Sequence, residues 1–129
     1  MTPAEAFAAI PLAAVCADHR LQSEEAQLLN SQLRGRSPYR EMEPVAFATM
    51  VSALLLGLRD RRDALLVEAA ALLSPEEQEQ AYALAARLIH ADRTATPEEL
   101  SLLKQVGSAL TLPAERLQEI AAACEPPLA

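Results

Sequence analysis

The sequence predicts an all-α fold, and its composition and an internal repeat carry that prediction. Hydrophobic residues make up 51% of the 129 positions, and most of them are alanine and leucine, which are strong helix formers. Aromatic residues, which favour strands, contribute only 3%, and glycine occurs three times. We therefore expect one compact domain of about seven helices, residues 1–124, followed by a flexible tail, residues 125–129.

The repeat covers residues 16–29 and, 74 positions later, residues 90–103. The identical pairs are Ala17 and Ala91, Asp18 and Asp92, Glu24 and Glu98, Glu25 and Glu99, Leu28 and Leu102, and Leu29 and Leu103. This pattern predicts two pseudo-repeated helical hairpins that flank a central apolar helix.

Capping signals place the first helices. Thr2-Pro-Ala-Glu5 has the residues of a capping box and predicts a helix that runs to about Asp18. Pro11 removes a backbone donor and should bend this helix or delay its start. A second helix is expected over residues 23–34, ending before Gly35, and residues 34–40 are expected to form a flexible connection.

The middle of the chain has a different pattern, because apolar residues surround the helix predicted over residues 43–58. These residues are Val45, Phe47, Met50, Val51, Leu54, Leu55, Leu56 and Leu58. A helix that is apolar all round belongs in the centre of a bundle, so we interpret this segment as the central helix. It is too short to span a bilayer, which takes roughly 20 apolar residues. Gly57 and the charged run at 59–63 predict a break before a fourth helix that ends at Leu73.

Two further capping boxes and a proline place the remaining helices. Ser74-Pro-Glu-Glu77 opens a fifth helix that should end near Asp92. Thr96-Pro-Glu-Glu99 opens a sixth, with an inward stripe of Leu100, Leu103, Val106 and Leu110. Thr111-Leu-Pro-Ala-Glu115 begins a seventh helix, which should reach about Ala123.

Charge and cysteine content limit the partners and the compartment. The chain has 18 acidic and 11 basic side chains, a net charge of −7, which disfavours nucleic acids and anionic membranes and favours basic or cationic protein partners. Without a signal peptide or a transmembrane segment, we expect a cytoplasmic protein. Cys16 and Cys124 are then expected to be core residues, with a bridge between them as the less favoured alternative. A homodimer and a peripheral membrane complex both stay open.

The chain resembles the tellurite-resistance protein B (TerB-like) family over residues 5–122. The resemblance lies in a unit that occurs twice, on either side of an apolar middle: a helix, then Ala-Asp, six further residues and Glu, then a second helix. Asp18 with Glu25, and Asp92 with Glu99, take the family's acidic positions, while His19 and Arg93 stand where members typically have glycine. The resemblance implies an all-helical, non-enzymatic adaptor in cytoplasmic metal- or stress-resistance complexes. It also implies two acidic loop sites for divalent cations.

The residues themselves allow two interpretations of these carboxylates. In the first, Asp18 and Glu25 share a Ca²⁺ or Mg²⁺ ion, as do Asp92 and Glu99, weakly, because hard cations need about six to eight oxygen ligands. In the second, the groups are structural: Glu99 closes the capping box with Thr96, and Asp92 accepts hydrogen bonds from the turn.

Other candidate sites have weaker patterns. Cys16, His19 and His90 could hold a soft metal, although their spacing matches no zinc motif. The basic clusters Arg34, Arg36, Arg40 and Arg59, Arg61, Arg62 are interpreted as locally ion-paired or as a surface for an acidic partner. Since the sequence has no catalytic motif, we expect an adaptor. A metal-free interaction or oligomerisation module is the alternative, and a carboxylate-dependent hydrolase the third.

Overall fold

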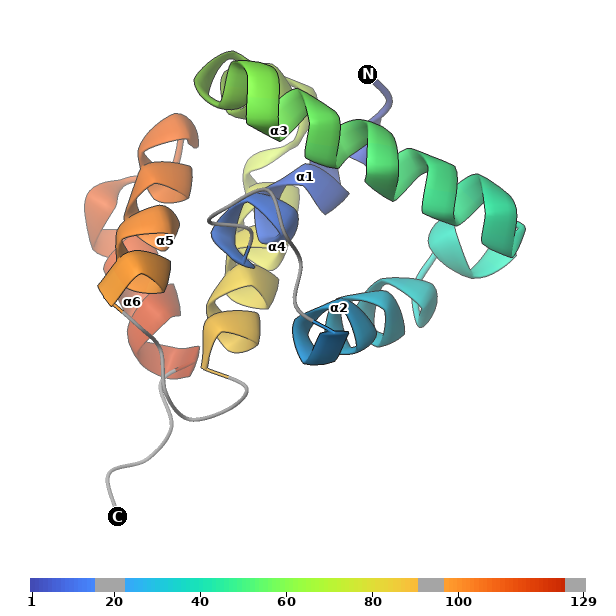
Figure 1. Ribbon diagram of the computed structural model, residues 1–129. Helices are drawn as coiled ribbons and strands as arrows, with labels where there is room; N and C mark the ends of the chain where they lie inside the picture. Colours follow the sequence, from blue (N-terminus) through green and yellow to red (C-terminus); the bar gives the residue numbers. More distant parts are fainter. Residues whose placement is uncertain (16–22, 91–96, 125–129) are drawn as a thin grey trace.

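The computed structural model describes residues 1–15, 23–90 and 97–124, with the backbone alone at 23–26 (Figure 1). These parts of the chain form a bundle of α-helices without a β-strand, so the predicted all-α class is confirmed. The elements, in order, are α1 (Pro3–Val15), α2 (Ser23–Arg34), the 3-10 turn η1 (Tyr39–Glu41), α3 (Pro44–Leu72), α4 (Pro75–Ile89), α5 (Pro97–Ala109) and α6 (Ala114–Cys124).

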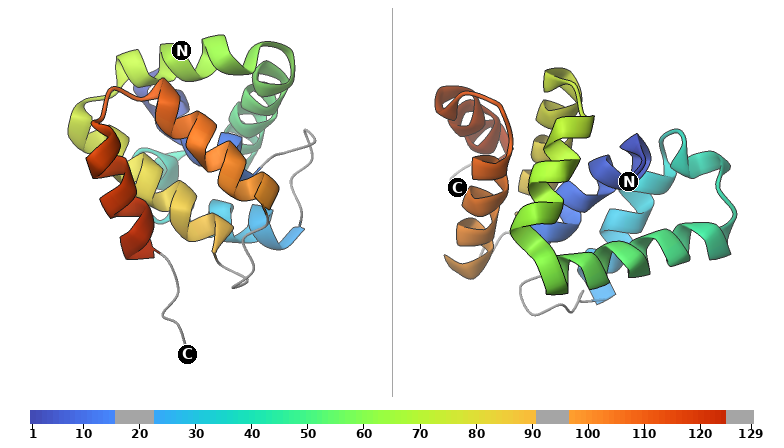
Figure 2. Two further views of the ribbon diagram at one scale, coloured as in Figure 1. Left: turned by 90° about the vertical axis from the view of Figure 1, so that its left-hand side faces the viewer. Right: turned by 90° about the horizontal axis from the view of Figure 1, so that it is seen from above.

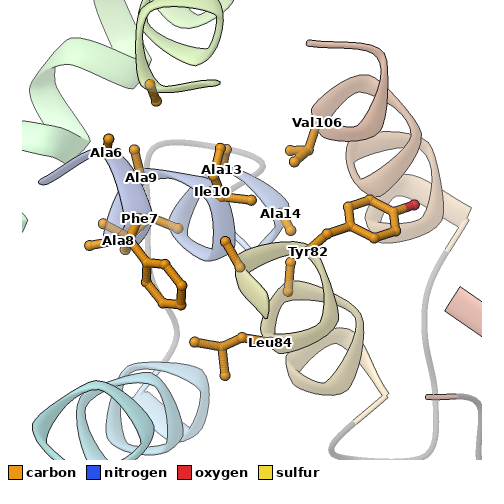
Figure 3. Close-up of a cluster of buried hydrophobic side chains, with 14 of the residues drawn as sticks. Ala6, Phe7, Ala8, Ala9, Ile10, Ala13, Ala14, Tyr82, Leu84 and Val106 are labelled. Carbon is orange, nitrogen blue, oxygen red and sulfur yellow. The ribbon is translucent and has the colours of Figure 1, made fainter. Parts of the chain in front are cut away.

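The centre of the bundle is α1. Every residue from 6 to 15 is buried, and α1 packs against α3, α4, α5 and α2. Five of these buried residues are alanines, whose small side chains let the neighbouring helices approach from several directions (Figure 3). Ile10 and Leu12 fill the remaining space between the helices with fully buried side chains.

The prediction that residues 43–58 form the central helix is therefore wrong. This part of α3 buries one stripe, Phe47, Met50, Leu54 and Leu58, against the rest of the bundle. Val45 and Leu56 lie on the opposite side and are 76% and 54% exposed. In the sequence, a helix with an exposed but uncharged side cannot be distinguished from a helix that is buried on all sides. In the structure, other helices cover only one side of α3.

The predicted break at residues 57–63 is a kink and not a loop. Arg61 has non-helical backbone angles, φ −149° and ψ 54°, yet helical geometry resumes at once and continues to Leu72. The third and fourth predicted helices are thus two limbs of α3, which Figure 2 shows turning around the bundle. The described residues accordingly contain six α-helices in place of the seven expected.

Two of the predicted capping boxes are present. The backbone nitrogen of Thr2 donates to Glu5 Oε1 at 2.9 Å, and that of Glu5 donates to Thr2 Oγ1 at 3.2 Å. Ser74 and Glu77 make the same exchange at 3.0 and 3.2 Å. Because α1 begins at Pro3 and continues through Pro11, the delayed start considered for this helix is wrong.

The connection from α2 to α3 was predicted to be flexible, but side chains hold it in place. Arg34 Nη1 donates to the carbonyl oxygens of Tyr39 and Met42 at 2.9 and 2.7 Å. Tyr39 is buried between the rings of Phe7 and Phe47, at centroid distances of 6.5 and 6.2 Å. Its hydroxyl donates to the carbonyl of Ala4, so this connection is anchored to the first turn of α1.

The two copies of the sequence repeat lie between helices of the bundle: the first copy connects α1 to α2, and the second connects α4 to α5. The expected helix ends at Asp18 and Asp92, and the cap at Thr96, lie outside the described residues. The repeated hairpin therefore stays a prediction.

Candidate functional site

The carboxylates proposed from the sequence as metal ligands are only partly described. Asp18 and Asp92 lie outside the described residues, and Glu25 is described by its backbone alone, in the first turn of α2. Glu99 is half-buried in the first turn of α5. Within residues 1–15, 23–90 and 97–124, no group of three or more His, Cys, Asp or Glu side chains could hold a metal ion. The cation site stays a prediction.

Arg62 occupies a position that the sequence did not suggest. Its Nη2 donates to the carbonyl oxygen of Ala13 in the last turn of α1. A cation is favourable there, because the C-terminal end of a helix carries a partial negative charge. The neighbouring arginines make the local ion pairs that were one interpretation of this cluster: Arg59 pairs with Asp60 at 3.0 Å and Arg61 with Glu68 at 3.1 Å.

The other candidate metal or redox residues do not come together among the described residues. Cys16 and His19 lie outside them, and His90 is the half-buried C-cap residue of α4. Cys124 is a free thiol at the end of α6, with its sulfur 3.6 Å from the carbonyl oxygen of Ala83. Burial raises the pKa of the Cys124 thiol, which disfavours the nucleophilic thiolate.

An apolar groove lies between α5 and α6, with Tyr82 of α4 at its floor. Its volume is about 760 Å³. Tyr82 points from α4 toward the two helices (Figure 3), and burial together with the nearby Cys124 raises its pKa. Leu103, Leu110 and Leu117 line the groove, and Leu100 on its rim is 46% exposed. The predicted inward stripe of α5 is thus buried only in part.

The walls of the groove are fixed by close packing and by polar contacts. A Cβ atom at Gly107 would lie 3.3 Å from both Leu117 Cδ1 and Tyr82 Cε1, so glycine keeps this part of the groove open. Arg116 on α6 pairs with Glu79 on α4 at 2.7 Å. We infer that the groove exists before any ligand binds, which lowers the entropic cost of binding.

The charge in the groove is a single cation. Lys104 is the only lysine in the chain, it is exposed on the α5 wall, and no ion pair involves it in the part of the chain that the structure describes. An apolar floor with one cation at the rim suits a ligand with a row of apolar groups and one carboxylate. The sequence signal for this site was a leucine, Leu100, followed by Lys104 one helical turn later, which is too common a pattern to identify the site.

A smaller hollow of about 370 Å³ lies beside the first turn of α1. Its cation, Arg36, is placed over the ring of Phe7 at 4.6 Å and lies 3.4 Å from Gln80 Oε1. Arg34 and Arg36 contact aromatic rings and uncharged polar groups of the bundle, and Arg40 pairs with Glu41 at 3.6 Å. The interpretation of local ion pairing therefore fits Arg40, while Arg34 and Arg36 are held by other contacts.

No family model, no curated protein and no solved structure matches the chain. Among the helices that the structure describes, none is both long and apolar enough to cross a membrane.

Proposed function

We propose that the chain is an interaction module that binds an amphipathic helix of a partner protein in the α5–α6 groove. The observation that carries this proposal is the groove itself: an apolar, preformed depression whose rim has a half-exposed leucine and a solitary lysine. Apolar grooves between two helices are a recurrent way of binding the apolar face of a third helix.

The groove also indicates the chemistry of the partner. The lining runs along α5, which has 13 residues and is therefore about 20 Å long, so a partner helix of about 12 to 14 residues would cover it. Leu100, Leu103 and Leu117 would contact apolar residues at positions i, i+3 or i+4, and i+7. Lys104 would pair with a carboxylate at the edge of that stripe.

A phage-displayed library of 16-residue peptides tests this function. We expect selection on the full chain to enrich peptides with that apolar spacing and an acidic residue, and a synthetic copy to bind with micromolar affinity. Leu100→Asp should weaken binding at least tenfold, and Lys104→Glu should weaken it only for peptides that carry the acidic residue.

Ala122→Asp is the control, because Ala122 is exposed on α6 and does not line the groove. Peptides that bind the wild type, Leu100→Asp and Ala122→Asp equally would show that the groove is not the site. Failure to enrich any helical peptide would also count against the proposal.

A cation-linked, TerB-like adaptor of a cytoplasmic metal- or stress-resistance system is a second proposal. It is supported by the sequence repeat, which sets Asp18 with Glu25 and Asp92 with Glu99 at a separation of 74 positions. Calorimetry with Ca²⁺, Mg²⁺, Mn²⁺ and Zn²⁺ should then give binding that Asp18→Asn and Asp92→Asn reduce and Glu115→Gln leaves unchanged. No heat below millimolar concentration would reject it.

A further inference from the structure

The first limb of α3 exposes a surface without charge. Residues 44–58 contain no ionisable side chain, and the side opposite Phe47 and Leu54 is exposed to solvent. We call this side the α3 outer face; its members are Val45, Ala48, Thr49, Ser52, Ala53 and Leu56. It is opposite the stripe of α3 that is buried against the bundle, and none of its members lines the groove between α5 and α6. Figure 1 shows how α3 and α1 are arranged.

This lack of charge is unusual for the chain and for a solvent-facing helix. The whole chain has a net charge of −7, and exposed helix faces normally carry charged or strongly polar residues. Val45 and Leu56, 76% and 54% exposed, are among the most exposed large apolar side chains of the described residues. Covering them would remove apolar surface from water without burying any charge.

The residues of the α3 outer face follow a nearly palindromic order: read from either end, each position has a residue of similar size and polarity. Reversal about the midpoint between Met50 and Val51 exchanges Val45 with Leu56, Ala48 with Ala53, and Thr49 with Ser52. A two-fold axis through that midpoint would therefore set residues of the same kind at the same level of two antiparallel helices. In a symmetric dimer the same patch of both copies meets across the two-fold axis, and this order would let it do so with residues of matching size.

The spacing and the sizes of these residues also suit a helix pair. Val45, Thr49, Ser52 and Leu56 are separated by four, three and four residues, the spacing of a coiled-coil seam. Small residues in the middle allow two helices to approach closely, and the larger Val45 and Leu56 fill the space where the helices diverge. The hydroxyl of Thr49 already donates to the carbonyl of Val45 at 2.8 Å, so the Thr49 hydroxyl would keep a partner when it is buried.

We propose that the α3 outer face binds the same face of a second copy of this chain, in antiparallel orientation. Charge favours a second copy over a different partner, because an uncharged face gives an acidic chain no charge with which to select a basic protein. A stable interface buries about 1,200–2,000 Å², and one helix pair of about 22 Å reaches at most the lower end. The dimer should therefore dissociate in the micromolar range.

Sedimentation equilibrium of the full chain, from low micromolar to submillimolar concentration, tests the dimer. The mass should rise from 13.9 kDa toward twice that value. Ser52→Glu places like charges beside the two-fold axis and should raise the dissociation constant at least tenfold. Ala122→Glu, on the exposed side of α6, adds the same charge elsewhere and should have little effect.

Mixtures of variants test the orientation. Val45→Lys and Leu56→Glu should each be monomeric alone and should dimerise when mixed, because only the antiparallel pair brings position 45 to the level of position 56. A mixture of Val45→Lys with Val45→Glu should stay monomeric. Circular dichroism of each variant checks that it is folded. Dimerisation of the mixture of Val45→Lys with Leu56→Glu shows that both variants can still associate.

A chain that is monomeric at all these concentrations would overturn the proposal. A dimer that Ser52→Glu leaves intact, or one restored by mixing Val45→Lys with Val45→Glu, would overturn it as well. Peptide binding in the α5–α6 groove is measured separately, so either proposal can fail without the other. If both hold, each dimer presents two grooves, and a partner with two helices gains avidity.

Discussion

Gln78 and Thr111 exchange hydrogen bonds between α4 and the α5–α6 connection. The backbone nitrogen of Thr111 donates to Gln78 Oε1 at 2.9 Å, and Gln78 Nε2 lies 2.9 Å from Thr111 Oγ1. The same Nε2 lies 3.2 and 3.3 Å from the carbonyl oxygens of Ala70 and Leu73. Gln78, which is only 2% exposed, thus joins the end of α3 and the start of α4 to the α5–α6 connection.

Gln78→Ala should lower the free energy of unfolding by about 2–3 kcal/mol, because it leaves buried donors and acceptors without partners. Urea denaturation followed by circular dichroism measures the change. The matched control is Gln105→Ala, at an exposed position on α5, which should change stability by less than about 0.5 kcal/mol. Equal effects of the two substitutions would show that the Gln78 contacts contribute nothing.

Arg62→Met should destabilise the bundle through the end of α1. The variant keeps an apolar stem of similar length but removes the donor to the Ala13 carbonyl, which lies in the buried part of α1. We expect a loss of about 1.5–3 kcal/mol in the free energy of unfolding, the range for hydrogen bonds to charged groups. Thermal and urea unfolding both measure it.

Arg59→Met is the control for Arg62. Arg59 is exposed and its ion pair with Asp60 is on the surface, so its loss should cost less than about 1 kcal/mol. If both arginines prove equally dispensable, the contact between Arg62 and α1 is not a stabilising one.

Local signals in the sequence predicted local structure well. The capping boxes at Thr2 and Ser74 are present with the expected exchange of hydrogen bonds, and α2 ends at Arg34 as predicted. A cap depends on residues three positions apart, and all of the necessary information lies in that short segment.

Features that depend on distant packing were not predictable in the same way. The burial of α1 and the exposure of one side of α3 depend on which helices cover them. Both segments are rich in apolar residues, so their hydropathy does not show which of the two is buried. The groove was missed for the same reason, since Leu100 fits the stripe of a buried helix but lies at its edge.

Gly57→Ala should destabilise the chain although alanine favours helices by about 1 kcal/mol. A Cβ at position 57 would overlap the side chain of Leu65, which packs back from the second limb of α3 and is 2% exposed. Overpacking of this kind costs about 1–3 kcal/mol. We expect a lower urea midpoint, measured against the wild type at one protein concentration.

Two further variants separate packing from backbone effects at Gly57. In Gly35→Ala the new Cβ would meet only an ordinary contact, 3.4 Å from the carbonyl oxygen of Ser31, so its unfolding should change little. In a double-mutant cycle with Leu65→Ala, the penalty of Gly57→Ala should largely disappear. A penalty that persists in the cycle would place its origin in the backbone of the kink.

The capping box at the start of α1 should make stability depend on pH. Hydrogen bonds from the backbone and side chain of Thr2 lower the pKa of the Glu5 carboxyl below its usual value of 4.5. A carboxyl whose pKa is lower in the folded state stabilises the fold above its unfolded pKa, and this contribution is lost as the pH falls through the folded pKa. Glu5→Ala should therefore lower the melting temperature at pH 7 and have a smaller effect at pH 3.

The expected loss at pH 7 is about 0.5 kcal/mol, at the low end of the range for helix caps, because solvent screens this part of the chain. Differential scanning calorimetry at the two pH values measures the difference. Glu43→Ala is the control, since Glu43 precedes α3 without a side-chain capping bond, and its effect at pH 7 should be smaller. A Glu5→Ala effect that is unchanged or larger at pH 3 would contradict the assigned role, because a protonated carboxyl cannot accept the amide bond as strongly as a carboxylate does.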